Sequence, residues 1–390
     1  MSDLELCYLP ATEAIARFKA KTLSPVELMQ AVIDRAEKVE KKINAFPLKF
    51  YDRALAQAKK AEEKYGKTDG RPRPLEGLPV AIKDEALIKG ERVTFGSLIY
   101  KDFVANETNP SIGRLLKAGA IMHARSAAPE FSCAPYTHSR IHGVTRTPWN
   151  TAYSCGGSSG GAGASLAAGT TALASGSDIG GSIRIPASMT GVVGYKPPYG
   201  RNPDTPPFNL DQYCHIGPMA RTVADAALMQ NIMCGPHPED ISTLRPKLRI
   251  PTELGDIKGW RIALCVNPAQ YDLDPDVVKN TRAAADMFRA AGAIVEEVDL
   301  GWKRADVVRA VDAHFGTIFG PQVDRYVKKH RKIMTDYAID FAREAKKIKK
   351  EEFLAGLEIE TAMYKSLGNT TEAKKYGDLA RVLEEPKSRR

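Results

Sequence analysis

The sequence lacks any apolar stretch long enough to cross a lipid bilayer. Its most apolar-looking run, residues 162–174, is interrupted by glycine, serine and threonine, whereas a transmembrane helix needs about 20 consecutive apolar residues. The first residues, Met1 to Glu5, carry acid where a secretory signal peptide carries base, and no apolar segment follows them. We therefore expect a soluble, cytoplasmic protein.

Ligand patterns for a metal ion or a phosphate are missing as well. There is no His-Glu-x-x-His motif and no cluster of Cys and His at zinc-binding spacing. The six cysteines lie far apart without a Cys-x-x-Cys pair, which is typical of reduced thiols. No Gly-Lys-Ser or Gly-Lys-Thr follows the glycine-rich segments, which excludes a Walker A loop there. The sequence predicts no metal and no cofactor.

Basic residues outnumber acidic ones, which gives the chain a formal net charge of +9. The densest basic runs are residues 328–332 and 346–350, and both lie in a stretch with helical character that also contains Asp and Glu. A solvated helical face explains this pattern, since no nucleic-acid-binding motif accompanies it. We expect no nucleic-acid partner.

The order of apolar segments favours an α/β fold. Residues 9–64 have helical periodicity, and Ser24-Pro25-Val26-Glu27 is a good helix start. Residues 78–82 and 260–266 have the length and composition of buried strands. A predicted helix over 274–291 and a predicted strand over 293–298 complete a strand–helix–strand rhythm. The last 75 or so residues are largely helical and charged. Without an internal repeat or a long linker, we expect one domain over residues 1–390.

Two segments rich in glycine and serine carry the candidate chemistry. Residues 156–161 read Gly-Gly-Ser-Ser-Gly-Gly, and residues 178–187 read Asp-Ile-Gly-Gly-Ser-Ile-Arg-Ile-Pro-Ala. Glycine lets backbone amides approach a ligand closely, and successive amides can form a nest for a developing negative charge. By composition alone, these segments also fit a flexible loop or a phosphate cradle.

A third element, residues 77–84 with the sequence Gly-Leu-Pro-Val-Ala-Ile-Lys-Asp, precedes them. Together, and with Gly-Val-Val-Gly-Tyr-Lys-Pro at 191–197, the three elements resemble the signature of the amidase signature family in order and spacing. The resemblance implies a mixed central sheet flanked by helices on both faces. It also implies a helical amino-terminal part (1–70), a signature core (71–235) and a strand–helix extension (236–390).

The resemblance implies a Ser–cis-Ser–Lys triad that hydrolyses a small amide through an acyl-enzyme. Ser182 would be the nucleophile, Ser158 the proton relay after a cis peptide bond from Gly157, and Lys83 the base. Ser159 either hydrogen-bonds within the site or supports its turn. The implied oxyanion hole is formed by the backbone amides of Ile179, Gly180, Gly181 and Ser182, and the supporting residues are Ser159, Asp178 and Arg184. We interpret the last two as a structural ion pair.

Lys83 carries the main physical requirement of this mechanism. A lysine acts as a base only when neutral, and its free pKa is about 10.4. Burial beside the apolar residues 80–82 lowers a lysine pKa, because a buried site disfavours the charged form. Asp84 would oppose that shift if it lay close, but adjacent residues of a strand point to opposite faces.

Three alternatives remain open. Gly156-x-Ser158-x-Gly160 also matches the nucleophile elbow of α/β-hydrolases, which would make an esterase with Ser158 as nucleophile. The family resemblance further implies sheet-forming segments, including one of Gly-Leu-Pro-x-Gly-Leu-Gln character, that are not found before Arg390. A shortened, catalytically impaired member would fit that difference. Within the family, an amidotransferase subunit that needs partner chains is also possible. A homodimer is also left open.

Overall fold

The computed structural model describes residues 2–251 and 253–369. The chain divides into two units, of which the first comprises Met1–Glu253 with Val327–Ile339 and the second Leu254–Tyr326 with Asp340–Arg390. Among the described residues, no helix combines the length and the apolar character that a membrane span requires.

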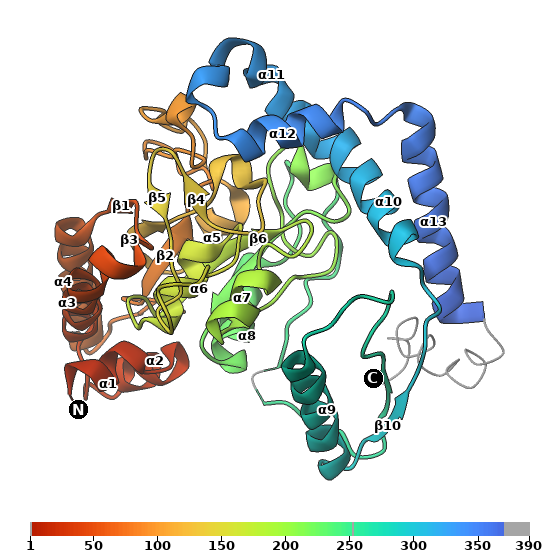
Figure 1. Cartoon of the computed structure of the whole chain (residues 1–390). Coiled ribbons are helices and arrows are strands. Elements are labelled where there is room, and N and C mark those ends of the chain that lie inside the picture. Colours follow the sequence, from red (N-terminus) through yellow and green to blue (C-terminus); the bar gives the residue numbers. More distant parts are fainter. Residues whose placement is uncertain (1, 252, 370–390) are drawn as a thin grey trace. The chain divides into compact units, whose positions relative to one another are not determined.

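A six-stranded mixed sheet is the centre of the first unit (Figure 1). The strand order is β1-β3-β2-β6-β8-β7, in which β2 runs parallel to β3 and β6 while the other neighbours are antiparallel. The strands are β1 Leu48–Lys49, β2 Pro79–Lys83, β3 Ile121–Ser126, β6 Leu173–Asp178, β7 Val193–Gly194 and β8 His215–Ala220; a separate hairpin pairs β4 His138–Ser139 with β5 Gly143–Val144. The predicted α/β class with a mixed central sheet is confirmed.

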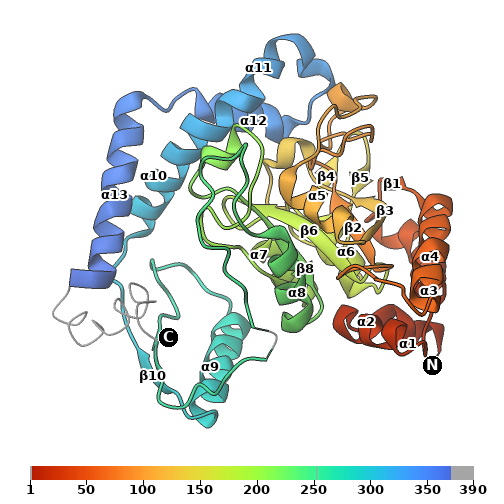
Figure 2. The same cartoon turned by 180° about the vertical axis from the view of Figure 1, so that it is seen from behind.

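Helices lie on both faces of this sheet. The helices of the first unit are α1 Asp3–Tyr8, α2 Ala11–Lys19, α3 Pro25–Ile43, α4 Tyr51–Gly66, α5 Pro110–Lys117, α6 Gly160–Ala167, α7 Arg184–Thr190 and α8 Val223–Met233. Of these, α6 contacts β2, β3, β6 and β8, while α8 contacts β6, β7 and β8. Figure 2 shows the same arrangement from behind, with α3 and α4 side by side, as in Figure 1.

Alternation along β2 explains why both faces are covered. Val80 pairs in register with Leu173 and belongs to the core cluster that includes α8, whereas Ala81 belongs to the cluster that includes α6. Ala124 and Ala174 stand in register with Ala81, so small side chains line the face toward α6. Since α6 itself reads Gly-Gly-Ala-Gly-Ala-Ser-Leu-Ala, it can lie close to the sheet.

The predicted start of the long helix α3 is confirmed. The Ser24 hydroxyl accepts a hydrogen bond from the Val26 amide at 2.9 Å, and the Glu27 carboxylate accepts one from the Ser24 amide at 2.8 Å. This reciprocal capping satisfies amides that have no partner inside the helix. The helix ends at Ile43, and Asn44, which caps it, adopts a left-handed conformation with φ 52°.

The second unit contains a two-stranded parallel sheet and several helices. The elements are β9 Arg261–Leu264, α9 Pro275–Ala290, β10 Ile294–Glu297, α10 Arg304–His314 and α13 Lys350–Asn369; a π-helix spans Phe315–Phe319, and α11 Gly320–His330 and α12 Asp336–Ala345 each extend into both units. The predicted strand–helix–strand order is confirmed. The predicted burial of 260–266 is wrong, because β9 pairs only with β10 in a small sheet and its residues are exposed or half-buried.

Candidate active site

The ends of two neighbouring parallel strands assemble the candidate site. β2 ends at Lys83 and its parallel neighbour β6 ends at Asp178, so both reach the same edge of the sheet. Ser158 lies in the turn before α6, and Ser182 lies in the loop between β6 and α7. The carboxyl ends of strands are where open α/β sheets commonly place their ligands.

The Lys83 side chain is buried and fully hydrogen-bonded. It is 1% exposed. Its Nζ atom donates to Ser158 Oγ at 2.7 Å and to Ser177 Oγ at 2.8 Å, and it forms an ion pair with Glu85 Oε2 at 3.1 Å. Burial lowers the pKa of Lys83, and the neighbouring Glu85 carboxylate opposes part of that shift. The predicted burial of Lys83 and its proximity to Ser158 are confirmed.

Glu85 is a member of the site that the sequence analysis missed. Its side chain is 21% exposed, and Ser132 Oγ donates a hydrogen bond to its carboxylate. Burial disfavours the Glu85 carboxylate, but the Lys83 charge and the hydrogen bonds from Ser132 and Ser177 hold its pKa below the ordinary value. Asp84 turns away and accepts from the Thr94 amide at 3.0 Å. Glu85 lies two residues after Lys83 in the turn that follows β2, so strand alternation by itself does not place it beside the amine.

The turn around Ser158 ties two loops together. The peptide bond between Gly157 and Ser158 is cis, as the family resemblance implies. Ser159 is fully buried, and its amide donates to the Ser182 carbonyl at 3.0 Å. Its hydroxyl bonds both to the amide and to the carbonyl of Ser177, each at 3.3 Å. Ser159 therefore connects the end of β6 with the loop that carries Ser182.

Glycine is required where α6 begins. A Cβ atom at Gly161 would lie 2.1 Å from the Ala127 nitrogen, and the Gly161 amide donates to the Ala127 carbonyl at 3.0 Å. Gly156 has φ +77° and leads into the turn in a left-handed conformation that favours glycine. Backbone proximity and turn geometry thus account for part of the Gly-Gly-Ser-Ser-Gly-Gly pattern.

Asp178 organises the loop that leads to Ser182. Its carboxylate accepts hydrogen bonds from the amides of Gly181 at 2.7 Å, Ile183 at 3.1 Å and Arg184 at 3.2 Å. The Arg184 guanidinium adds two bonds of 2.9 Å, which confirms the predicted ion pair. Burial alone would raise the pKa of Asp178, but Arg184 and the loop amides lower it overall. The Gly181 bond to Asp178 competes with any role of that amide in an oxyanion hole.

The same loop borders solvent-accessible space. An open pocket is lined by Gly180, Gly181, Arg184, Ile185, Ser188 and Met189. Two of the predicted oxyanion-hole residues therefore line this pocket close to Ser182 in sequence, Gly180 exposed and Gly181 buried.

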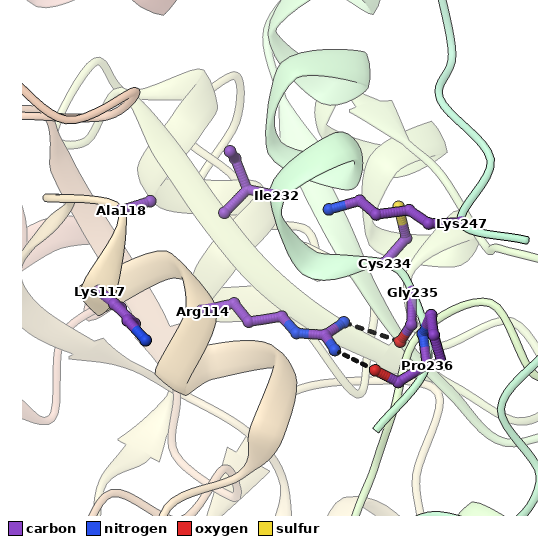
Figure 3. Close-up of a pocket in the computed structure, with 8 residues that line it drawn as sticks. All are labelled: Arg114, Lys117, Ala118, Ile232, Cys234, Gly235, Pro236 and Lys247. Atoms are coloured by element: carbon purple, nitrogen blue, oxygen red, sulfur yellow. Dashed lines mark hydrogen bonds between the residues drawn. The ribbon is translucent and has the colours of Figure 1, made fainter. Parts of the chain in front are cut away.

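A second pocket, shown in Figure 3, contains none of the candidate catalytic residues. It lies between α5 and the chain after α8. Arg114 from α5 donates to the carbonyls of Met233, Gly235 and Pro236 at 2.7–2.8 Å, and two of these bonds are drawn in Figure 3. Since its guanidinium binds main-chain oxygens, we interpret Arg114 as a residue that joins these segments.

The geometry around Ser158 does not match a nucleophile elbow. An elbow requires a strand that leads directly into the nucleophile and a histidine as its base. Residues 147–157 instead form turns and irregular backbone with one isolated bridge at Ser154, and Ser158 Oγ accepts a hydrogen bond from Lys83. Over residues 2–251 and 253–369, no group of three or more His, Cys, Asp or Glu side chains is arranged to hold a metal ion.

Three comparisons with known proteins, by family model, by sequence and by structure, all find amidase-type proteins. The model of the family described as amidase matches residues 27–382. The chain is 39% identical over 308 residues to a glutamyl-tRNA(Gln) amidotransferase subunit from Carboxydothermus hydrogenoformans, covering 76% of this chain and 62% of that protein. The corresponding Geobacter sp. protein is 36% identical over 306 residues, covering 76% and 61%. The chain thus spans about three fifths of the length of these curated relatives.

Among solved structures, a bacterial aryl acylamidase of the amidase signature family superposes with a TM-score of 0.84 at 27% sequence identity. The superposition covers 93% of this chain and 77% of that one.

Proposed function

The chain belongs to the amidase signature family, and on that premise we propose that it hydrolyses the C–N bond of a carboxamide. The observation that carries the proposal is the buried amine of Lys83 at 2.7 Å from Ser158 Oγ. A desolvated lysine beside a hydroxyl is a suitable general base, because burial favours its neutral form.

In the proposed reaction, neutral Lys83 takes the proton of Ser158, which takes the proton of Ser182. Ser182 Oγ attacks the amide carbonyl, and backbone amides of its loop stabilise the oxyanion. The relay then returns the proton to the leaving nitrogen, which breaks the C–N bond and leaves an acyl-enzyme. Water, activated by the same relay, releases the acid. The hydrogen bond from Ser159 to the Ser182 carbonyl supports this assignment, because it holds the two serine segments together.

The test uses a panel of simple amides, aryl anilides and urea derivatives, with release of ammonia or aniline as the readout. We expect Ser182→Ala to abolish turnover and Lys83→Ala to reduce kcat/KM by about 10²–10⁴-fold, the usual contribution of a general base. Lys59→Ala, which removes an exposed lysine of α4, is the control for Lys83→Ala and should leave turnover unchanged. Full activity in Lys83→Ala together with loss in Ser158→Ala would instead favour an elbow-type esterase.

A second function is favoured by sequence identity: the chain is 39% and 36% identical to the two curated relatives but 27% identical to the aryl acylamidase. We propose as an alternative that the chain releases ammonia from an amide donor within an assembly of partner chains, as the relatives' name suggests. Hydrolysis of aryl anilides by the purified lone chain would count against this alternative. Glutamine hydrolysis that appears only after a partner chain is added would favour it.

A further inference from the structure

We propose that Glu85 is a positioning residue of the relay: together with Ser177 it binds the two N–H groups of neutral Lys83, so that the lone pair is directed at Ser158. This inference rests on the proposed function, since it assigns Lys83 the task of accepting a proton from Ser158. It concerns how the base is oriented and charged, which the triad alone does not specify.

The argument begins with the number of hydrogens on the lysine nitrogen. A protonated amine has three N–H donors, and Lys83 Nζ has three acceptors within 3.1 Å: Ser158, Ser177 and Glu85. A neutral amine has two donors and one lone pair. If Ser177 and Glu85 retain those two hydrogens, the lone pair is left facing the Ser158 hydroxyl, which is the orientation a base needs.

Electrostatics supports the same assignment. When Lys83 accepts a proton, it becomes a buried cation, and an anion 3.1 Å away stabilises that charge. Burial lowers the pKa of Lys83 and Glu85 raises it, so the carboxylate prevents the lysine from becoming too weak a base. Asp178 at the end of β6 also acts to raise the pKa of Lys83. Cys214 before β8 would do so only as a thiolate, and burial raises the pKa of its thiol well above the ordinary value.

Glu85 is itself held in its charged form. Ser132 donates to its carboxylate, and the pKa of Glu85 lies below its ordinary value. The titratable groups near it are Asp204 and Cys214, both of which interact with its charge. Burial raises the pKa of Asp204 to about 7. At a pH above that value Asp204 and Glu85 are both charged, so the test needs a pH range that extends below it.

The experiment measures how fast a fluorophosphonate labels Ser182 in the full chain, as a function of pH, with the modified peptide identified by mass spectrometry. This readout needs no knowledge of the natural substrate. We compare the parent chain with Glu85→Gln, which keeps an acceptor oxygen but removes the charge. The matched control is Glu91→Gln, whose carboxylate pairs with Arg53 outside the site. Melting temperatures verify that each variant is folded.

In the parent, labelling should accelerate as pH rises and Lys83 loses its proton. In Glu85→Gln the midpoint of this rise should move to lower pH by about one unit or more, the effect typical of removing an opposite charge at contact distance. The maximal rate should also fall, because a weaker base accepts the proton less readily. Glu91→Gln should behave like the parent.

Glu85→Asp is the second variant, and it tests the same shift of the labelling midpoint if Glu85→Gln does not fold. Its carboxylate keeps the charge at a greater distance, so its midpoint should lie between those of the parent and the glutamine variant. An unchanged midpoint in every folded Glu85 variant, with normal labelling of the parent, would overturn the inference while leaving the proposed function intact. A parent chain that is not labelled at Ser182 at any pH would overturn the proposed function, and this inference with it.

Discussion

Replacing Asp178 by asparagine should destabilise the fold much more than removing its charged partner Arg184. The Asp178 carboxylate accepts five hydrogen bonds, three from backbone amides and two from the guanidinium. Asparagine has one acceptor oxygen and one NH2 group. In the less damaging orientation the NH2 group replaces Oδ1, so the Gly181 amide and one Arg184 nitrogen lose their acceptor.

The magnitude follows from the burial of each partner. A buried charge-assisted hydrogen bond contributes about 1.5–3 kcal/mol, whereas the Arg184 side chain is 55% exposed and contributes about 1 kcal/mol or less. We therefore expect Asp178→Asn to lower the free energy of unfolding by about 2–4 kcal/mol. Arg184→Gln should lower it by at most about 1 kcal/mol. Urea denaturation followed by circular dichroism measures both, provided that the m-values agree.

The pH dependence gives an independent check. Because the folded state lowers the pKa of Asp178, its stabilisation is present above the unfolded pKa and is lost as the pH falls through the folded pKa. The difference between the parent and Asp178→Asn should therefore shrink in acid. Equal losses in Asp178→Asn and Arg184→Gln at neutral pH would refute the reasoning, because they would show that the exposed ion pair, rather than the buried loop amides, carries the energy.

Two further predictions concern packing around the site. Gly161→Ala should destabilise the chain by about 3 kcal/mol or more, the upper end for overpacking, because the new Cβ would lie 2.1 Å from the Ala127 nitrogen. Thermal melting measures the loss. The control is Gly66→Ala, where a Cβ meets nothing within 4 Å, and it should melt like the parent. Glu130→Gln should accelerate hydrogen exchange around Thr335, whose amide and hydroxyl both donate to the Glu130 carboxylate at 2.6 and 2.7 Å; unchanged exchange would show that this contact does not hold the segment.

Local rules predicted much of the secondary structure. The helix start at Ser24 depends on a serine and a glutamate three residues apart, which act within one turn. The strand predicted at 78–82 lies at Pro79–Lys83, since its apolar run is short and ends at a charged residue. Such features depend on neighbours in the chain, so the sequence contains the information directly.

Burial and pairing were harder to predict. The run 260–266 has the composition of a buried strand, yet β9 belongs to a two-stranded sheet with exposed and half-buried residues. An apolar run indicates a strand, but the number of strands beside it depends on the rest of the chain. Ser177 and Ser132 were missed as partners of Lys83 and Glu85 for the same reason, because a lone serine has no distinguishing pattern in sequence.

By itself the sequence determined the family, the α/β class and the candidate residues Lys83, Ser158 and Ser182, because long motifs of unusual composition are specific in order and spacing. Only the tertiary structure decided what surrounds the lysine. The parallel pairing of β2 with β6, and the position of α6 over them, bring the Lys83 amine to Ser158, 75 positions along the chain. The resulting burial lowers the pKa of Lys83 and the Glu85 ion pair opposes that shift, and both depend on neighbours that only folding brings together.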